Sequence, residues 1–291
     1  MNLFLKKIVH FSFFLSLILF TIAFILLKNN PHVYQQLFYY QLKKLKTHKS
    51  YSTLFIGDSS LGNAIDSDEF SNLSSHTSIN GALNGLYGYA GSYNMLKTAH
   101  RYNPNLRNVI VMQTLDMQTR KVAMDGYVRS CTSISDFTET DDKLDFIKEG
   151  IQYIRSIPLS IWAIKKDSLL VNDYIKQKGL YKPDSIQIPL SVDKINTNKS
   201  MYLIKIKEYC LQHNLNMIYI HGPLYEEKIA VSHNYINETN RLLNDNNINF
   251  IGQTTPIKRS QLGNTEDHVN PKYKKEFTKI YYEILKNHLV R

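Results

Sequence analysis

A serine and a histidine that lie far apart in the chain stand in contexts that suit nucleophilic catalysis. Ser59 ends a Gly-Asp-Ser turn directly after the apolar run 51–56, and His268 lies in the Asp-His-Val-Asn segment 267–270. A serine hydroxyl is a weak nucleophile at neutral pH, so it needs a base to take its proton and donors to hold the oxyanion that its attack creates. We therefore take Ser59 as the candidate nucleophile and His268 as its candidate base.

The elements around these residues predict where they lie. Residues 51–56 read as a buried strand, and a polar turn after such a strand lies at the carboxyl edge of an α/β sheet, where ligands bind. His268 precedes a helical pattern, so its side chain can reach back over the same edge. His221 ends another candidate strand near the same edge, where it is a second candidate base or a substrate contact.

Strand and helix patterns alternate from residue 51 onward, which predicts an α/β fold with a parallel sheet covered on both faces. The candidate strands are 51–56, 76–79, 108–114, 215–221 and 248–252. The candidate helices are 92–101, 199–213, 226–244 and 271–289. Residues 120–198 fit the alternation poorly, so we interpret them as an insertion within one catalytic-sized domain, residues 51–291.

The chain begins with a long apolar run, residues 8–27, whose only polar members are His10, Ser12, Ser16 and Thr21. About 20 apolar residues are enough for a helix to cross a bilayer, so residues 1–30 are predicted to be a cytosolic tail and a transmembrane helix. A cleaved signal peptide usually has a shorter apolar region and small residues at its cleavage point. Residues 31–50 are predicted to be a basic amphipathic linker, either an interfacial helix or a plain stalk or docking helix.

The formal net charge of +10 is concentrated near the N-terminus. Residues 1–50 hold seven lysines and no acidic residue, which leaves only +3 for the rest of the chain. Such a distribution is typical of a segment beside anionic lipid and not of a folded nucleic-acid-binding face, so no nucleic-acid partner is predicted. The two cysteines make neither a disulfide framework nor a zinc set. No metal and no organic cofactor is implied.

Three blocks taken together resemble the SGNH (GDSL-like) hydrolase superfamily. They are Gly-Asp-Ser at 57–59, Ile-Asn-Gly-Ala-Leu-Asn-Gly at 79–85 and Asp-His-Val-Asn-Pro-Lys at 267–272. The resemblance covers roughly residues 51–291 and is greatest to the membrane-anchored branch associated with bacterial envelope polysaccharide acylation. It implies a flavodoxin-like three-layer sandwich with a central parallel sheet of about five strands, and hydrolysis or transfer of acyl esters.

The resemblance also implies which groups would hold an oxyanion. The backbone N–H groups of Ser59 and Gly85 stand at two of the superfamily's donor positions. The third block usually supplies an asparagine side chain, which is missing here. Asp116 would repel an oxyanion as a carboxylate, so Gln113 or Asn84 is expected to take that place.

The acid of the triad departs from the superfamily pattern as well. It is expected three residues before His268, where this chain has Thr265. Either Glu266 or Asp267 orients His268, or a Ser–His dyad operates, or the site is degenerate and inactive; the block pattern leaves these alternatives open. The substrate contacts that we predict are Asp58, Asn80, Asp116, His221 and Asn270.

The function that this resemblance implies is a serine esterase or O-acyltransferase acting on an envelope or exported polysaccharide. A transferase would draw on a membrane acyl-donor protein. The resemblance places the catalytic domain on the extracytoplasmic, periplasmic side of the cytoplasmic membrane, whereas the lysines around residues 8–27 favour a cytoplasmic body under the positive-inside rule. The alternative is a degenerate relative that binds glycan or assists assembly. A nucleotide-binding role is disfavoured because the turn after the first strand lacks phosphate-loop glycine spacing.

Overall fold

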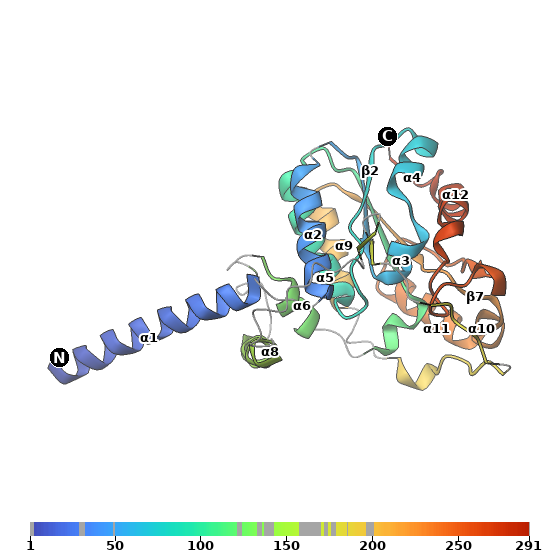
Figure 1. Ribbon diagram of the computed structural model, residues 1–291. Helices are drawn as coiled ribbons and strands as arrows, with labels where there is room; N and C mark the ends of the chain where they lie inside the picture. The colour runs from blue at the N-terminus through green and yellow to red at the C-terminus, as the bar shows by residue number, and fades with distance from the viewer. Residues whose placement is uncertain are drawn as a thin grey trace.

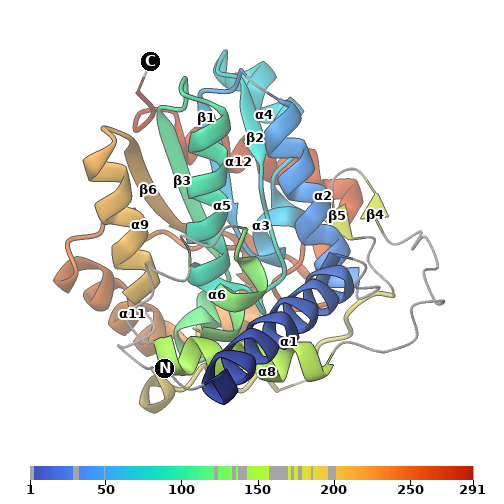
Figure 2. The same ribbon diagram turned by 90° about the vertical axis from the view of Figure 1, so that its left-hand side faces the viewer.

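Five parallel strands form the central sheet, in the order β2-β1-β3-β6-β8, and Figure 2 labels the first four of them. Their bounds are β1 Thr53–Gly57, β2 Ser78–Asn80, β3 Asn108–Gln113, β6 Asn216–His221 and β8 Phe250–Ile251. Counted along the chain, this order is 2-1-3-4-5, the flavodoxin-like order. The five-stranded parallel sheet and its α/β architecture are therefore confirmed.

The computed structural model describes residues 3–28, 33–48, 50–120, 124–132, 136, 143–156, 170–171, 174–175, 179–184, 186–195 and 201–290. Much of the insertion expected at 120–198 lies outside the described residues. Its described parts include α6 Met124–Ser130, α8 Lys143–Ser156, the antiparallel pair β4 Leu170–Val171 and β5 Tyr174–Ile175, and the 3₁₀ turn η2 Val192–Lys194.

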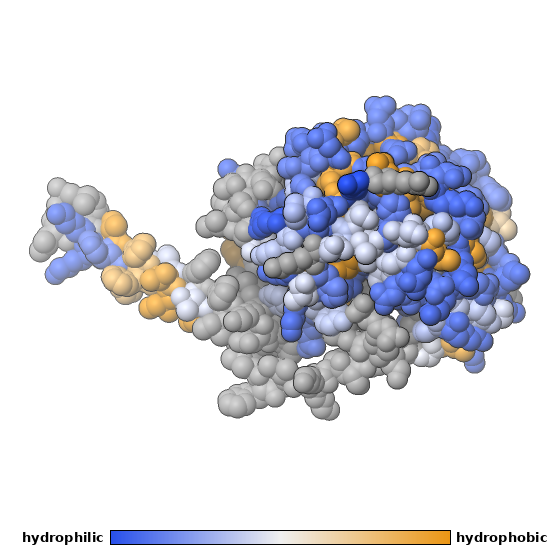
Figure 3. Space-filling model, turned by 90° about the horizontal axis from the view of Figure 1, so that it is seen from above, coloured by the Kyte–Doolittle hydropathy of each residue, from blue (hydrophilic) through white to orange (hydrophobic). Residues whose placement is uncertain are grey.

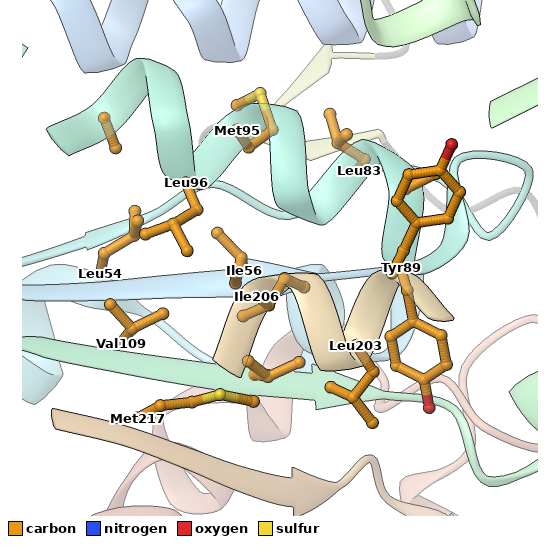
Figure 4. Packing of buried hydrophobic residues seen from close by; sticks show 14 of the residues in the cluster. Leu54, Ile56, Leu83, Tyr89, Met95, Leu96, Val109, Leu203, Ile206 and Met217 are labelled. Atoms are coloured by element: carbon orange, nitrogen blue, oxygen red, sulfur yellow. The ribbon is translucent and has the colours of Figure 1, made fainter. Parts of the chain in front are cut away.

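Helices cover both faces of the sheet, as Figure 2 shows. One face carries α2 Val33–Thr47, α5 Gly88–Tyr102 and α9 Met201–Gln212, and the other carries α3 Ser59–Ala64, α4 Ser67–Ser74 and α12 Lys274–Leu285. Alternation along the strands explains the two layers, because successive side chains of a strand point to opposite faces. Leu54 and Ile56 pack toward α5 (Figure 4), whereas Phe55 between them belongs to the opposite core.

Two predicted helices differ from those observed. The pattern at 226–244 is divided into α10 Glu226–Val231 and α11 His233–Asp245, because the backbone of Ser232 leaves the helical region at φ −111° and ψ 19°. The last helix starts as a 3₁₀ turn, η5 Pro271–Tyr273, and continues as α12 only to Leu285. Asn270 caps this start, since its side chain accepts a hydrogen bond from the backbone N–H of Lys272.

The helix α2 packs against the body of the protein. Leu37, Phe38, Leu42 and Leu45 on its inner face are buried. Two polar side chains reinforce this contact: Lys44 donates to the carbonyl of Asn80, and Gln41 Nε2 donates to the carbonyl of Ala82 at 2.9 Å. Of the two alternatives left open by the sequence, the described contacts favour a docking helix.

The first helix, α1 Leu3–Lys28, extends away from the body (Figure 1) and carries exposed apolar side chains, seen in Figure 3. Within the described part of the chain, no helix combines the length and the apolar character needed to span a membrane.

Candidate active site

The loops after β1 and β3 meet at the carboxyl edge of the sheet, beside the point where the strand order reverses. Ligands of open α/β sheets bind at such a switch point. Ser59 is the first residue of α3 and is 9% exposed, with Asp58 as the N-cap. Gly57 permits the close approach of these two strands, because a Cβ at this position would overlap the carbonyl oxygen of Met112 on β3. Glycine is thus required directly before the site.

Asp58 fixes the start of α3 and ties it to the loop after β3. One carboxylate oxygen accepts hydrogen bonds from the backbone N–H of Ser60 at 3.0 Å and from its hydroxyl at 2.6 Å. The other accepts the backbone N–H of Thr114 at 3.0 Å. Burial, followed by the nearby charge of Asp267, raises the pKa of Asp58 to about 6. Asp58 therefore has a positioning role toward Ser59.

His268 is held by a loop whose two arms hydrogen-bond to each other. Leu262 and Val269 form an antiparallel bridge. The backbone N–H of Gly263 donates to the carbonyl of His268 at 2.7 Å. The segment between the arms is thereby closed into a tight loop that presents the imidazole. As the sequence predicts, this loop precedes the final helix.

The imidazole of His268 is oriented by Asn264, which sequence reasoning missed. Nδ1 of His268 lies 2.7 Å from Oδ1 of Asn264. An oxygen partner requires Nδ1 to carry the hydrogen, which leaves Nε2 able to accept a proton. Burial, opposed by Asp267, lowers the pKa of His268 below its usual value. The ring is thus neutral at pH 7, as a general base must be.

Asp267 is a buried carboxylate close to that ring. Its Oδ1 lies 3.9 Å from Nε2 of His268 and accepts the hydroxyl of Thr265 at 2.6 Å. Burial alone would raise the pKa of Asp267, but His268, the Thr265 hydroxyl and Arg120 together lower it. Asp267 is therefore ionised at neutral pH and would stabilise His268 once Nε2 is protonated. Glu266 points elsewhere, toward Lys228, with 3.5 Å between their charged atoms.

Arg120 is the second residue that sequence reasoning missed. Two of its nitrogens contact the carboxylate of Asp116, Nε at 3.1 Å and Nη2 at 2.9 Å. Nη2 also lies 4.0 Å from Asp267. Its third nitrogen, Nη1, lies so close to Gly85 that a Cβ on this glycine would overlap it. The spacing of four residues between Asp116 and Arg120 was a usable signal, since opposite charges so spaced often pair.

A cavity of about 210 Å³ opens beside Arg120. Its wall combines two threonine hydroxyls and three carboxylates with the guanidinium and two leucines. The lining residues are Thr114, Asp116, Arg120, Leu190, Leu224, Thr265, Glu266 and Asp267. Such a wall suits a ligand with several hydroxyl groups and a small apolar part.

Several predicted site residues make hydrogen bonds inside the core and do not line the cavity. The Gln113 side chain is fully buried and donates to the Ser92 hydroxyl at 3.0 Å. His221 is fully buried, and its Nε2 lies 2.7 Å from Oδ1 of Asn240. Asn80 donates to the carbonyl of Ile65 at 2.8 Å and is also buried. These contacts give no support to an oxyanion role for Gln113 or to substrate contacts by His221 and Asn80.

The remaining candidates lie nearer the surface but act locally. Asn84 is half-buried, and its Oδ1 accepts the backbone N–H of Leu86 at 3.0 Å. Asn270 caps the turn η5. Among the described residues, the Ser59 hydroxyl makes no hydrogen bond to His268. The described residues also hold no cluster of His, Cys, Asp and Glu able to bind a metal.

Comparison with known proteins gives no family assignment. No protein-family model matches the chain, and no curated protein matches its sequence. Three solved structures are similar in outline. A Streptococcus pneumonia structure provisionally described as a platelet activating factor has a TM-score of 0.41 and 12% identity, over 93% of this chain and 99% of that one.

The acetyl xylan esterase Est2A from the rumen bacterium Butyrivibrio proteoclasticus gives a TM-score of 0.36 and 13% identity, over 82% of this chain and 64% of that chain. A provisionally described acylhydrolase from Bacteroides fragilis NCTC 9343 gives 0.33 and 10%, over 86% and 91%. At these TM-scores the likenesses carry no argument about this chain's activity. Its fold rests on its own strand order, and its function must be argued from its own site.

Proposed function

We propose that the protein is a serine ester hydrolase or O-acyltransferase with Ser59 as nucleophile and His268 as base. One observation carries the proposal: Ser59 starts a helix at the switch point of the sheet, and a loop at the same edge presents His268 with its Nδ1 side already occupied by Asn264. Thr114 supports a single site for the two segments, because its backbone N–H donates to Asp58 at 3.0 Å and it lines the same cavity as Asp267. The superfamily resemblance of the three sequence blocks agrees with this assignment.

The proposed reaction proceeds through a covalent acyl-enzyme. The Ser59 hydroxyl oxygen attacks the ester carbonyl carbon while Nε2 of His268 takes its proton, and the carbonyl electron pair moves onto oxygen. Collapse of this tetrahedral species expels the alcohol oxygen, which receives the proton from His268. Water as the second acceptor gives hydrolysis, and a sugar hydroxyl gives transfer. We expect the hydrogen bond between the Ser59 hydroxyl and His268 to form when substrate binds, since catalytic hydrogen bonds often tighten only in the complex.

Labelling with a fluorophosphonate probe tests the activated serine. The detergent-solubilised protein is compared with Ser59→Ala and His268→Ala, and with Ser50→Ala and His233→Ala as matched variants at exposed positions. We expect labelling of the wild type and of the two exposed variants, and loss of labelling in both site variants. Absence of labelling in a folded wild-type sample would overturn the proposal.

We further propose an envelope or exported polysaccharide as substrate and attachment to the cytoplasmic membrane, with the catalytic domain outside. The hydroxyl-binding character of the 210 Å³ cavity supports a sugar ligand. The apolar run 8–27 and the exposed apolar side chains of α1 support attachment, while some side chains of that helix lie outside the described residues. Reporter fusions after residue 30 test on which side of the membrane the catalytic domain lies. Activity of a cytoplasmic reporter would overturn the extracytoplasmic placement. A membrane acyl-donor partner would be required only for transfer.

A second candidate is a non-catalytic glycan-binding or assembly protein on the same fold. The lack of a hydrogen bond between Ser59 and His268 among the described residues favours it, as does a cavity whose lining does not include Ser59. In that case Ser59→Ala retains glycan binding and cellular function, whereas Asp116→Ala, at the cavity wall, loses binding.

A further inference from the structure

Arg120 has hydrogen-bond donors that the protein leaves unused. Its Nε donates a hydrogen bond to the carboxylate of Asp116 at 3.1 Å, and its Nη2 lies 2.9 Å from the other oxygen of that carboxylate as an ion pair. Its Nη1 makes no hydrogen bond among the described residues and lies against the backbone of Gly85. The Arg120 side chain is 34% exposed and lines the 210 Å³ cavity. A ligand can therefore reach two N–H donors beside Gly85.

The Asp116 pairing fixes where these donors point. A guanidinium is planar, so a carboxylate that holds two of its nitrogens also sets the direction of the third. Nη2 of Arg120 lies 4.0 Å from Asp267, and at the start of α3 burial raises the pKa of Asp58 while the charge of Arg120 opposes that rise. Arg120 is thus within electrostatic range of the residue before Ser59 and of the residue before His268.

Two of the side chains expected from the sequence, Gln113 and Asp116, give no hydrogen-bond donor for an oxyanion at this site. Gln113 uses its amide nitrogen on the Ser92 hydroxyl inside the core. Asp116 carries no donor when ionised, and its charge is already matched by Arg120. An ester-cleaving site at this edge therefore needs a donor from elsewhere.

We propose that Arg120 is a catalytic residue that donates from Nη1 to the oxyanion, next to the backbone N–H of Gly85. This inference rests on the proposed acyl-enzyme chemistry of Ser59. When the carbonyl electron pair moves onto oxygen, the negative charge lies between the Gly85 N–H and the guanidinium. When the tetrahedral species collapses, the pair returns to form the acyl-enzyme carbonyl. Arg120 stays protonated throughout, and no further reactant is needed.

The test compares wild type, Arg120→Ala and Arg120→Lys in the full-length, detergent-solubilised protein, with Arg241→Ala as the matched control. Arg241 also pairs with two carboxylates, Glu238 and Asp245, but is exposed on α11. The readouts are kcat and KM for p-nitrophenyl acetate, the rate of fluorophosphonate labelling, and circular dichroism as a check of folding. Methylguanidinium is then added to Arg120→Ala.

Arg120→Ala is expected to lower kcat about 100-fold to 1,000-fold with little change in KM, because an oxyanion donor acts mainly in the transition state. Methylguanidinium should restore part of this loss, and Arg120→Lys should remain impaired because a lysine lacks the planar fork. Arg241→Ala should equal wild type. If wild type reacts and a folded Arg120→Ala or Arg120→Lys reacts equally fast, the Arg120 role is overturned while the serine mechanism stands. If wild type is neither labelled nor hydrolyses the ester, the Arg120 role and the serine mechanism are both overturned.

Discussion

The Asp58 carboxylate accepts the backbone N–H of Thr114 at 3.0 Å and so joins the loop after β1 to the loop after β3. The same carboxylate holds the N–H and hydroxyl of Ser60. All of these donors come from the protein itself. Asp58 therefore fixes the geometry of the turn that carries Ser59, and its contacts give no direct support to the substrate contact expected from the sequence.

The buried charge of Asp58 predicts a specific dependence of stability on pH. Burial, with Asp267, raises the pKa of Asp58 from 3.8 to about 6. Between these values the folded protein keeps a proton that the unfolded chain has released, so the stabilisation is complete below the lower value and is lost as pH rises through the higher one. In urea unfolding, the advantage of wild type over Asp58→Asn should shrink by about 2 kcal/mol from pH 4 to pH 7.

The exposed Asp193 gives the control for this measurement. Asp193→Asn, a surface substitution, should leave the free energy of unfolding within about 0.5 kcal/mol of wild type. An advantage of wild type over Asp58→Asn that grows with pH would show that the hydrogen bonds to Asp58 outweigh its burial.

Asn264 predicts how the activity depends on pH. Burial lowers the pKa of His268 below 6.5, so the rate of fluorophosphonate labelling should rise with pH and reach its plateau with a midpoint below that value. Asn264→Asp places a carboxylate at Nδ1, which favours the protonated ring, and should move the midpoint upward by about 1 unit or more. Asn264→Ala should lower the plateau by about 10-fold or more, because the ring loses its orienting partner. Identical profiles in all three proteins would show that Asn264 does not orient the ring of His268 in the reaction.

Gly57 makes a prediction about the packing that supports the site. Gly57→Ala would drive a methyl group into the Met112 carbonyl between two central strands and should lower the free energy of unfolding by about 2 kcal/mol. At Gly150, on α8, an added Cβ would meet no further atom of the described residues within 4 Å. Gly150→Ala should therefore raise stability by about 0.5–1 kcal/mol, since glycine is a poor helix former. Equal effects of both substitutions in urea unfolding would contradict the packing argument.

The sheet was predictable because its strands carry strong local signals. Four of the five are short, mainly apolar runs, whereas β2 has Ile79 as its one apolar residue. The division at Ser232 was not predictable from the apolar spacing, which continues through it. It depends on a contact distant in sequence: the Ser232 hydroxyl accepts the backbone N–H of Leu190 at 3.1 Å.

The site was predictable only where a residue type announces its chemistry. Ser59 and His268 stand out in a sequence; the structure has Ser59 at the start of α3 and His268 hydrogen-bonded to Asn264, and their roles as nucleophile and base stay predictions. Asn264 and Arg120 do not stand out, because their roles arise from which atoms face them after folding. Gln113 is the opposite case: its side chain is of a suitable type for an oxyanion donor, but after folding its amide donates to the Ser92 hydroxyl inside the core.

The contact between α2 and the body predicts that this helix is part of the fold and not a mere tether. Leu45 of α2 is fully buried, whereas Leu144 of α8 is 82% exposed. Leu45→Ala should lower the free energy of unfolding by about 2–5 kcal/mol, because it leaves a cavity in the core. Leu144→Ala should change it by less than about 0.5 kcal/mol. Both variants are measured by urea unfolding of the full chain in the same detergent. If Leu45→Ala were as harmless as Leu144→Ala, α2 would be only loosely attached, and the interfacial alternative for this helix would regain its place.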